Sequence, residues 1–167
     1  MQITDQLNRP ISLPSVPKRI ISLVPSLTEL LVDLGLKDSI VGVTKFCVHP
    51  SHLRKQVDVI GGTKKVHVDK VAALNPDFVI ANKEENTKED IEGIAKFCPV
   101  YVSDIKTPVD TADLLKVLGV IFDKTAITDN INEQLKAAHP HDLFSGQRVA
   151  YLIWKNPYMT IGGDTYI

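Results

Sequence analysis

Short apolar runs alternate with amphipathic segments along most of the chain. Residues 20–24 form a compact apolar run, which is typical of a strand that is buried on both faces. Similar runs predict further strands at residues 40–43, 57–60, 78–81 and 100–102. Upstream, residues 3–13 resemble a short hairpin with a polar turn.

Segments with apolar residues every three or four positions lie between these runs and predict helices. The first follows residues 20–24 directly: Ser26 and Glu29 have the spacing of a capping box, and Gly35 is suited to end the helix. Its apolar face would carry Leu27, Leu30, Leu31 and Leu34. Further helices are expected at residues 68–74, 87–97 and 110–122.

Strands that alternate with helices about every 20 residues predict an α/β fold, with a parallel sheet and helices on both faces. Residues 125–139 predict a second long helix directly after the helix at 110–122, which breaks the alternation. A new strand is expected at residues 148–154 and another near 159–161, so a domain boundary is placed across the second helix.

The amino-acid composition argues against several classes of binding partner. The 167 residues are 44% hydrophobic and 23% charged, with a net charge of −1, which argues against nucleic acid or a membrane surface as the main partner. No apolar run has the length of a membrane span, and the first twenty residues contain no signal peptide. Either the protein is cytoplasmic, or an export segment lies outside this sequence. The two cysteines, Cys47 and Cys98, could be free or paired.

In a doubly wound sheet, ligands bind at the carboxyl ends of the strands. The first loop selected by this rule contains Pro25 and Ser26. Ser26 lacks the glycine-flanked pattern of a nucleophile, so a helix cap is the expected role. The free amides of the helix start could still receive an anionic group.

The second loop carries Phe46, Cys47 and His49, with His52 and His67 beyond it. The spacing matches neither a CxxC nor an HxxxH zinc pair, so no metal site is expected. Phe46 is instead expected to present an aromatic face.

The third and fourth loops are charged. Gly62, Thr63 and Lys64 follow a strand without the pattern of a phosphate loop, and the lysines either are solvated or line a cleft for an anion. Asn82 and Lys83 precede two adjacent glutamates, which point apart and form no acid–base pair. No catalytic set is predicted.

Taken together, several stretches resemble the class III periplasmic binding proteins, which serve cobalamin, ferric siderophores, haem and related chelates. The resemblance begins with Ile3-Thr4-Asp5, Arg9-Pro10-Ile11 and residues 17–29, and continues through residues 41–43, 59–62, 71–81 and 154–163. It implies two α/β lobes joined by a long, rigid helix, with the ligand between them and an ABC permease as the docking partner.

The resemblance also implies roles for individual residues. Asp69 matches a carboxylate that docks on the permease, and Phe46 matches an aromatic residue that touches the corrin in the cobalamin-binding member. Two further aromatic positions fall on Thr63 and Asn82, which leaves a polar, lysine-rich rim that favours an anionic chelate. The expected ligand-binding residues are Pro25, Ser26, Phe46, Gly62, Thr63, Lys64, Asn82, Lys83, Trp154 and Met159.

On this basis, residues 1–122 are expected to form the first lobe with its hairpin, 123–142 the linker helix, and 143–167 the beginning of an incomplete second lobe. The implied function is a non-enzymatic, extracytoplasmic substrate-binding component of an importer, without a cofactor of its own. The incomplete lobe could pair with another molecule. The alternative is a cytoplasmic doubly wound protein with a cofactor-binding or regulatory role.

Overall fold

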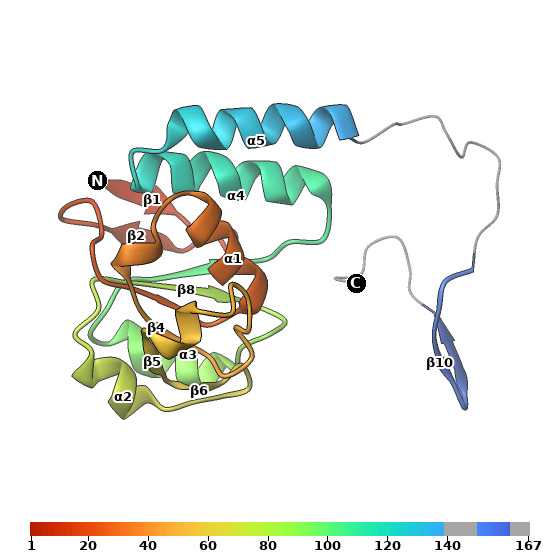
Figure 1. The fold of residues 1–167 in the computed structure, drawn as a ribbon, viewed down its shortest axis with the longest axis horizontal. Helices are drawn as coiled ribbons and strands as arrows, with labels where there is room; N and C mark the ends of the chain where they lie inside the picture. Colours follow the sequence, from red (N-terminus) through yellow and green to blue (C-terminus); the bar gives the residue numbers. More distant parts are fainter. Residues whose placement is uncertain (139–149, 161–167) are drawn as a thin grey trace.

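The computed structural model describes residues 1–138 and 150–160, and its centre is a five-stranded parallel sheet in the order β5-β4-β3-β8-β9 (Figure 1). The chain builds this sheet outward in both directions from β3, so the direction of winding reverses between β3 and β8. Such a reversal is a topological switch point. The strands are β3 (Ile20–Ser22), β4 (Ile40–Val43), β5 (Asp58–Val59), β8 (Phe78–Asn82) and β9 (Val100–Ser103).

Helices cover both faces of the sheet, which confirms the predicted α/β class. Figure 1 shows α4 and α5 on one side, and α2 and α3 on the other. All residues of β3, β8 and β9 are therefore buried, as expected of strands between two helical layers. The helices are α1 (Pro25–Asp33), α2 (Val68–Ala73), α3 (Lys88–Ala95), α4 (Pro108–Ile121) and α5 (Thr125–Ala138), with short 3-10 turns η1 (Lys37–Ser39) and η2 (Leu53–Lys55).

The expected capping box at Ser26 is wrong. α1 begins at Pro25 with Val24 at the cap position, and no side chain caps it. Proline suits the first position of a helix because its ring presets φ and the amide it lacks would be unpaired there. Pro25 therefore starts the helix one residue early, and Ser26 lies within the first turn. Gly35 does follow the helix end, with a φ of +74°.

The N-terminal hairpin is confirmed, with β1 (Gln2–Thr4) antiparallel to β2 (Pro10–Ser12). Its turn is attached to β9 through the buried carboxylate of Asp5. One oxygen accepts the backbone amides of Leu7 and Arg9, at 3.0 and 2.9 Å. The other accepts the Arg9 guanidinium at 2.6 Å and the amide of Val102 at 3.3 Å.

The second long helix, α5, packs along α4, as the sequence predicts. Beyond it, β10 (Leu152–Lys155) and β11 (Tyr158–Thr160) form an antiparallel hairpin whose residues are all exposed. Both expected strands are found, but the first begins later than predicted, because residues 150 and 151 are not in a strand. Residues 148, 149 and 161, which were also expected in strands, lie outside the described residues. Within the described ranges, no helix has the length and hydrophobicity to cross a bilayer. The division into lobes stays a prediction.

Candidate functional site

The loops at the carboxyl edge of the sheet are joined by one buried side chain, Asn86. Its Oδ1 accepts the backbone amide of Asn82 at 2.9 Å. Its Nδ2 donates to the carbonyl oxygens of Thr63 at 2.9 Å and Leu23 at 3.4 Å. The loops after β3, β5 and β8 are therefore held together. Sequence reasoning missed Asn86, because an asparagine before a helix carries no periodic signal of such a role.

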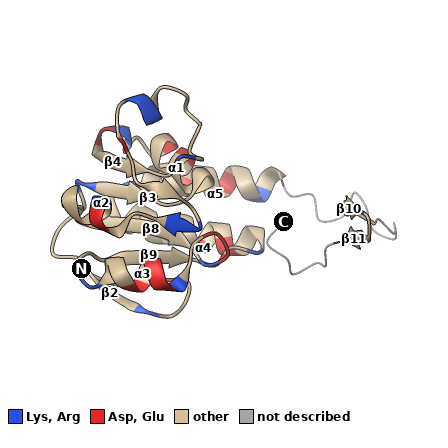
Figure 2. Ribbon diagram, turned by 90° about the horizontal axis from the view of Figure 1, so that it is seen from below, with Lys and Arg blue, Asp and Glu red and all other residues tan. Residues whose placement is uncertain are grey.

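A basic hollow of about 430 Å³ opens at this edge, and we call it the cationic hollow. Phe46 is 51% exposed beside it, and the Lys45 ammonium lies 5.0 Å from the centre of the Phe46 ring. Figure 2 shows basic and acidic positions spread over the whole lobe, and three of the basic ones, Lys45, Lys64 and Lys65, line this hollow. The lining is Lys45, Phe46, Gly61, Gly62, Thr63, Lys64, Lys65 and His67.

The cationic hollow is shaped by a small hairpin, in which β6 (Gly61–Gly62) pairs with β7 (Lys65–Val66). Gly61 has a φ of +115°, a conformation that side chains rarely adopt, so a glycine is favoured at this position. The amide of Lys45 donates to the Gly61 carbonyl at 2.8 Å, and the Lys64 ammonium donates to the carbonyl of Glu84. These bonds bring three lysine side chains around one opening.

A second hollow of about 640 Å³ lies at the switch point, between α1, the loop after β9, and helices α4 and α5. We call it the apolar hollow, because five of its eleven lining residues are leucine or isoleucine, from four segments of the chain. The lining is Ser26, Leu27, Leu30, Asn82, Ile105, Lys106, Thr107, Pro108, Thr111, Leu114 and Leu135. Ligands of doubly wound proteins bind at such a switch point.

Comparison with known sequences assigns this arrangement to a family. The family profile for "Periplasmic binding protein" matches residues 20–142, which is most of the chain. The chain belongs to this family. A curated relative, the vitamin B12-binding protein of Vibrio vulnificus, is 26% identical over 165 residues, covering 93% of this chain and 59% of the relative.

A second curated relative is an uncharacterized ABC transporter substrate-binding lipoprotein, YvrC, of Bacillus subtilis. It is 41% identical over 81 residues, covering 48% of this chain and 25% of the relative. The chain therefore spans between a quarter and three fifths of the length of these relatives.

Solved structures of the family share the fold. The periplasmic vitamin B12-binding protein BtuF of Vibrio cholerae has a TM-score of 0.74 at 23% identity, covering 89% of this chain and 60% of that one. The petrobactin-binding protein YclQ of Bacillus subtilis also has a TM-score of 0.74 at 23% identity, covering 82% and 50%.

Six of the ten predicted ligand-binding residues line one of the two hollows of this family member. Phe46, Gly62, Thr63 and Lys64 line the cationic hollow, and Ser26 and Asn82 line the apolar one. Pro25 lies beside Ser26 at the start of α1. Their contacts with a ligand stay predictions.

The Asn82 amide is already used within the fold. Its Nδ2 donates to Ser103 Oγ at 3.1 Å, and its Oδ1 accepts the amides of Glu84 and Glu85 at 2.9 and 3.2 Å. Lys83 lines neither hollow and pairs with Asp104 at 2.9 Å. The hydrogen bond and charge of Asp104 raise the pKa of Lys83 above its usual value.

The remaining predicted residues lie away from the hollows. Trp154 and Met159, which are 64% and 49% exposed, are on the β10–β11 hairpin. Asp69 is exposed in the first turn of α2. Its docking role stays a prediction.

Cys47 is buried beneath the cationic hollow. Its sulfur lies 3.1 Å from Thr28 Oγ1 and 3.2 Å from Thr44 Oγ1, so it anchors the loop that presents Phe46. Cys47 and Cys98 are both free. In the two described ranges, no group of three His, Cys, Asp or Glu side chains is arranged to hold a metal ion.

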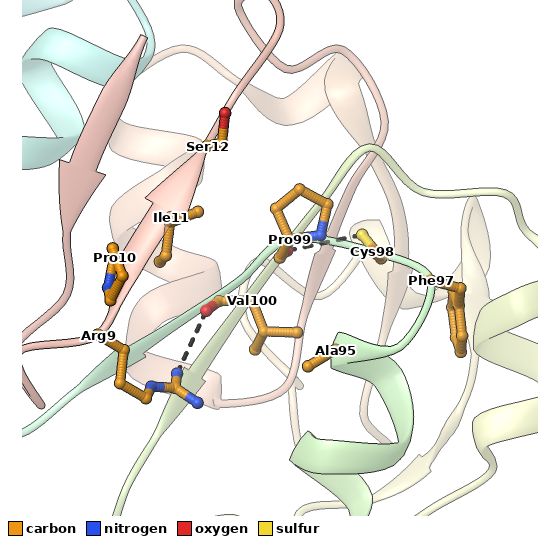
Figure 3. A pocket seen from close by; sticks show the side chains of 9 residues that line it. All are labelled: Arg9, Pro10, Ile11, Ser12, Ala95, Phe97, Cys98, Pro99 and Val100. Atoms are coloured by element: carbon orange, nitrogen blue, oxygen red, sulfur yellow. Dashed lines mark hydrogen bonds between the residues drawn. The ribbon is translucent and has the colours of Figure 1, made fainter.

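A further hollow, of about 440 Å³, lies at the opposite edge of the sheet, near the start of β9 (Figure 3). Arg9 and Phe97 flank it, and an Arg9 nitrogen donates to the Val100 carbonyl at 3.3 Å. Burial raises the pKa of the Cys98 thiol, which also lines it, to about 12. This hollow is separated from the carboxyl edge by the length of the strands.

Proposed function

We propose that this chain forms the first ligand-binding lobe of the substrate-binding component of an ABC importer, and that the ligand is an anionic metal chelate. Family membership supports the transport role, since the relatives named above include an ABC transporter substrate-binding lipoprotein. The proposal that the ligand is anionic rests on the cationic hollow, because Lys45, Lys64 and Lys65 surround it and its lining contains no carboxylate.

The chemistry of the cationic hollow suits a chelate with carboxylate or other oxyanion groups. Ammonium groups donate charge-assisted hydrogen bonds to such groups. Phe46 offers apolar contact to the carbon skeleton of the ligand, and Gly62 keeps the opening wide. A Cβ at Gly62 would lie 3.4 Å from both Lys45 and Phe46.

The differences from the cobalamin-binding member also favour an anionic chelate over a corrin. Thr63 and Asn82 stand where aromatic residues would touch a corrin ring, and both are nearly buried. Related structures bind quite different compounds by their names, from vitamin B12 to petrobactin and molybdate. The fold alone therefore does not determine the ligand, which must be determined by the residues that line the hollow.

The partners follow from the same proposal. The binding component would act outside the cytoplasmic membrane, deliver its ligand to permease subunits and perform no chemical step. No cofactor beyond the transported chelate is needed.

The experiment is calorimetric titration and thermal unfolding of the chain with ferric citrate, haemin, cyanocobalamin, molybdate and ATP. We expect ferric citrate to bind and to raise the unfolding temperature, because ligands that bind only the folded state stabilise it. Lys65→Glu should weaken that binding by roughly ten- to a hundredfold, the value of a charge-assisted hydrogen bond.

The matched control is Lys96→Glu. Lys96 follows α3 at the opposite edge of the sheet and lines neither hollow, so its reversal changes the net charge by the same amount. Equal losses in both variants would show a nonspecific charge effect. Binding of ATP instead of any chelate would favour the cofactor-binding alternative.

A further inference from the structure

The apolar hollow has no role in the proposal above, although it opens at the same edge as the cationic hollow. The two linings are connected by hydrogen bonds. Asn82 lines the apolar hollow and Thr63 the cationic one, and Asn86 bonds to both at 2.9 Å. Backbone groups of the two linings therefore lie within the span of a single side chain, which places the two openings next to each other at this edge.

Three of the five polar side chains in the wall of the apolar hollow are bonded within the fold, and Ser26 and Lys106 are the other two. Both ends of the Asn82 amide are bonded. Thr107 Oγ1 donates to Asp110 at 2.9 Å, and Thr111 Oγ1 donates to the Thr107 carbonyl at 3.4 Å. Besides the Ser26 hydroxyl and the Lys106 ammonium, the wall offers a ligand aliphatic surface, including the half-buried side chains of Leu30 and Leu135. Such aliphatic surface gains from burying methylene groups.

We infer that the ligand is an amphipathic chelate: its anionic, metal-binding end contacts the lysines of the cationic hollow, and an apolar arm of the same molecule lies in the apolar hollow. This inference rests on the proposed function and narrows its ligand class. The apolar arm is assigned to the same ligand because the linings of the two hollows are joined through Asn86 at one edge of the sheet.

The test uses two synthetic citrate–hydroxamate chelators that differ only in a straight acyl chain, each loaded with Fe³⁺. Calorimetric titration of the whole chain gives an affinity for each. We expect the acylated chelate to bind more tightly, by about fourfold for each methylene that is buried. Apolar burial should also make the heat-capacity change of binding more negative for that chelate.

Leu135→Asn tests the place where the arm binds, and Ile127→Asn is its control. Both residues are on α5, and Ile127 is partly exposed outside the hollow, so both variants introduce the same polar residue on the same helix. Leu135→Asn should reduce the ratio of the two affinities toward one, and Ile127→Asn should leave that ratio unchanged. Leu30→Asn, on α1, repeats the test on an independent helix.

The outcomes separate the two proposals. Equal affinities for the two chelates in the unaltered chain would overturn the amphipathic ligand and leave an anionic chelate as the function. An unchanged ratio in both Leu135→Asn and Leu30→Asn would overturn the assignment of the arm to this hollow. If neither ferric chelate binds, the proposed function fails as well.

Discussion

At the scale of single residues, the start of α4 depends on reciprocal bonds between Thr107 and Asp110. The Asp110 carboxylate accepts the amides of Lys106 at 2.9 Å and Thr107 at 2.8 Å, and Thr107 Oγ1 faces the Asp110 amide at 3.3 Å. The backbone bond from Lys106, followed by the Thr107 hydroxyl, lowers the pKa of Asp110 below its usual value.

This lowered pKa predicts an acid-dependent stability. Since the folded state holds the Asp110 proton more weakly than the unfolded chain, the contribution is present above the unfolded pKa of about 3.9 and is lost as the pH falls through the folded value. Urea unfolding at pH 7 and pH 3 should show a smaller fall in unfolding free energy for Asp110→Asn than for the unaltered chain.

The control for this prediction is Asp129→Asn on α5, where the described structure contains no hydrogen bond to the aspartate side chain. In Asp129→Asn, the unfolding free energy should fall between pH 7 and pH 3 as much as in the unaltered chain. If the fall were equally small in Asp110→Asn and Asp129→Asn, the cap would have no role in the acid dependence. Thr107→Ala should cost about 1 kcal/mol at neutral pH, the usual value of a helix cap.

The same cap shows where residue-level prediction failed. Sequence reasoning placed a capping box at Ser26 and overlooked the one at Thr107, although both helices have proline at the first position. Proline fixes the helix start, so the residue before it becomes the cap: Val24 in α1 and Thr107 in α4. The serine–glutamate spacing was a weaker signal than the neighbouring proline.

At the scale of elements, α5 illustrates a helix that is correctly predicted but whose packed face is only partly given by its apolar residues. Ile131 and Leu135 are half-buried, yet Ile127 is 38% exposed, and the fully buried residues are Thr128 and Asn132. Those polar residues face small positions of α4: the Asn132 amide reaches the Ala112 carbonyl at 3.4 Å. The spacing of hydrophobic residues predicts that a helix forms, but the shape of the neighbouring helix determines which of its faces is buried.

Gly119 of α4 provides a test of this close packing. A Cβ there would lie 2.3 Å from Thr128 Oγ1 and 3.2 Å from Thr125 Cα, so Gly119→Ala must push α5 away. We expect a loss of about 1–3 kcal/mol in unfolding free energy, as for an overpacked core. Adding Thr128→Ala should recover part of it. Urea unfolding measures both.

Gly93→Ala on α3 is the matched control. Its Cβ would meet Val68 methyl groups at 3.6 and 3.7 Å, an ordinary contact. The variant should gain up to about 1 kcal/mol from helix propensity. A Gly119→Ala protein as stable as the unaltered chain would mean that the two helices separate without cost.

At the scale of the whole molecule, the sequence predicted the α/β class and the loops that lie at the carboxyl edge of the sheet, because strand runs and loop positions are local signals. It did not predict that the loops would form two hollows of different chemistry. The two hollows depend on contacts between distant parts of the chain. Asn86 bonds to residues 23 and 63 positions before it, and Leu135 on α5 lines the same hollow as Leu27 and Leu30 on α1. Such contacts carry no local pattern.

Docking on a permease belongs to this scale as well. Asp69 is exposed in the first turn of α2, so Asp69→Lys should leave the lobe folded, with a cost of at most about 1 kcal/mol from the helix dipole. In a full-length protein with its cognate permease, the reversal should slow association and reduce ligand transport.

A charge-matched control for docking is Asp38→Lys in η1, an exposed aspartate away from α2. Transport that stays unchanged in Asp69→Lys, or that falls equally in both variants, would refute the docking role of Asp69.

The last prediction concerns the β10–β11 hairpin, which carries several large exposed side chains: Tyr158 is 70% and Trp154 64% exposed, and Leu152 and Met159 are about half exposed. Apolar groups on a two-stranded hairpin with free edges recruit other chains. We therefore expect the 167-residue chain to self-associate, with light scattering giving a mass above that of a monomer. Trp154→Lys should lower that mass, whereas Val109→Lys, at an equally exposed position on α4, should not. A monomer at all concentrations would contradict pairing through the hairpin.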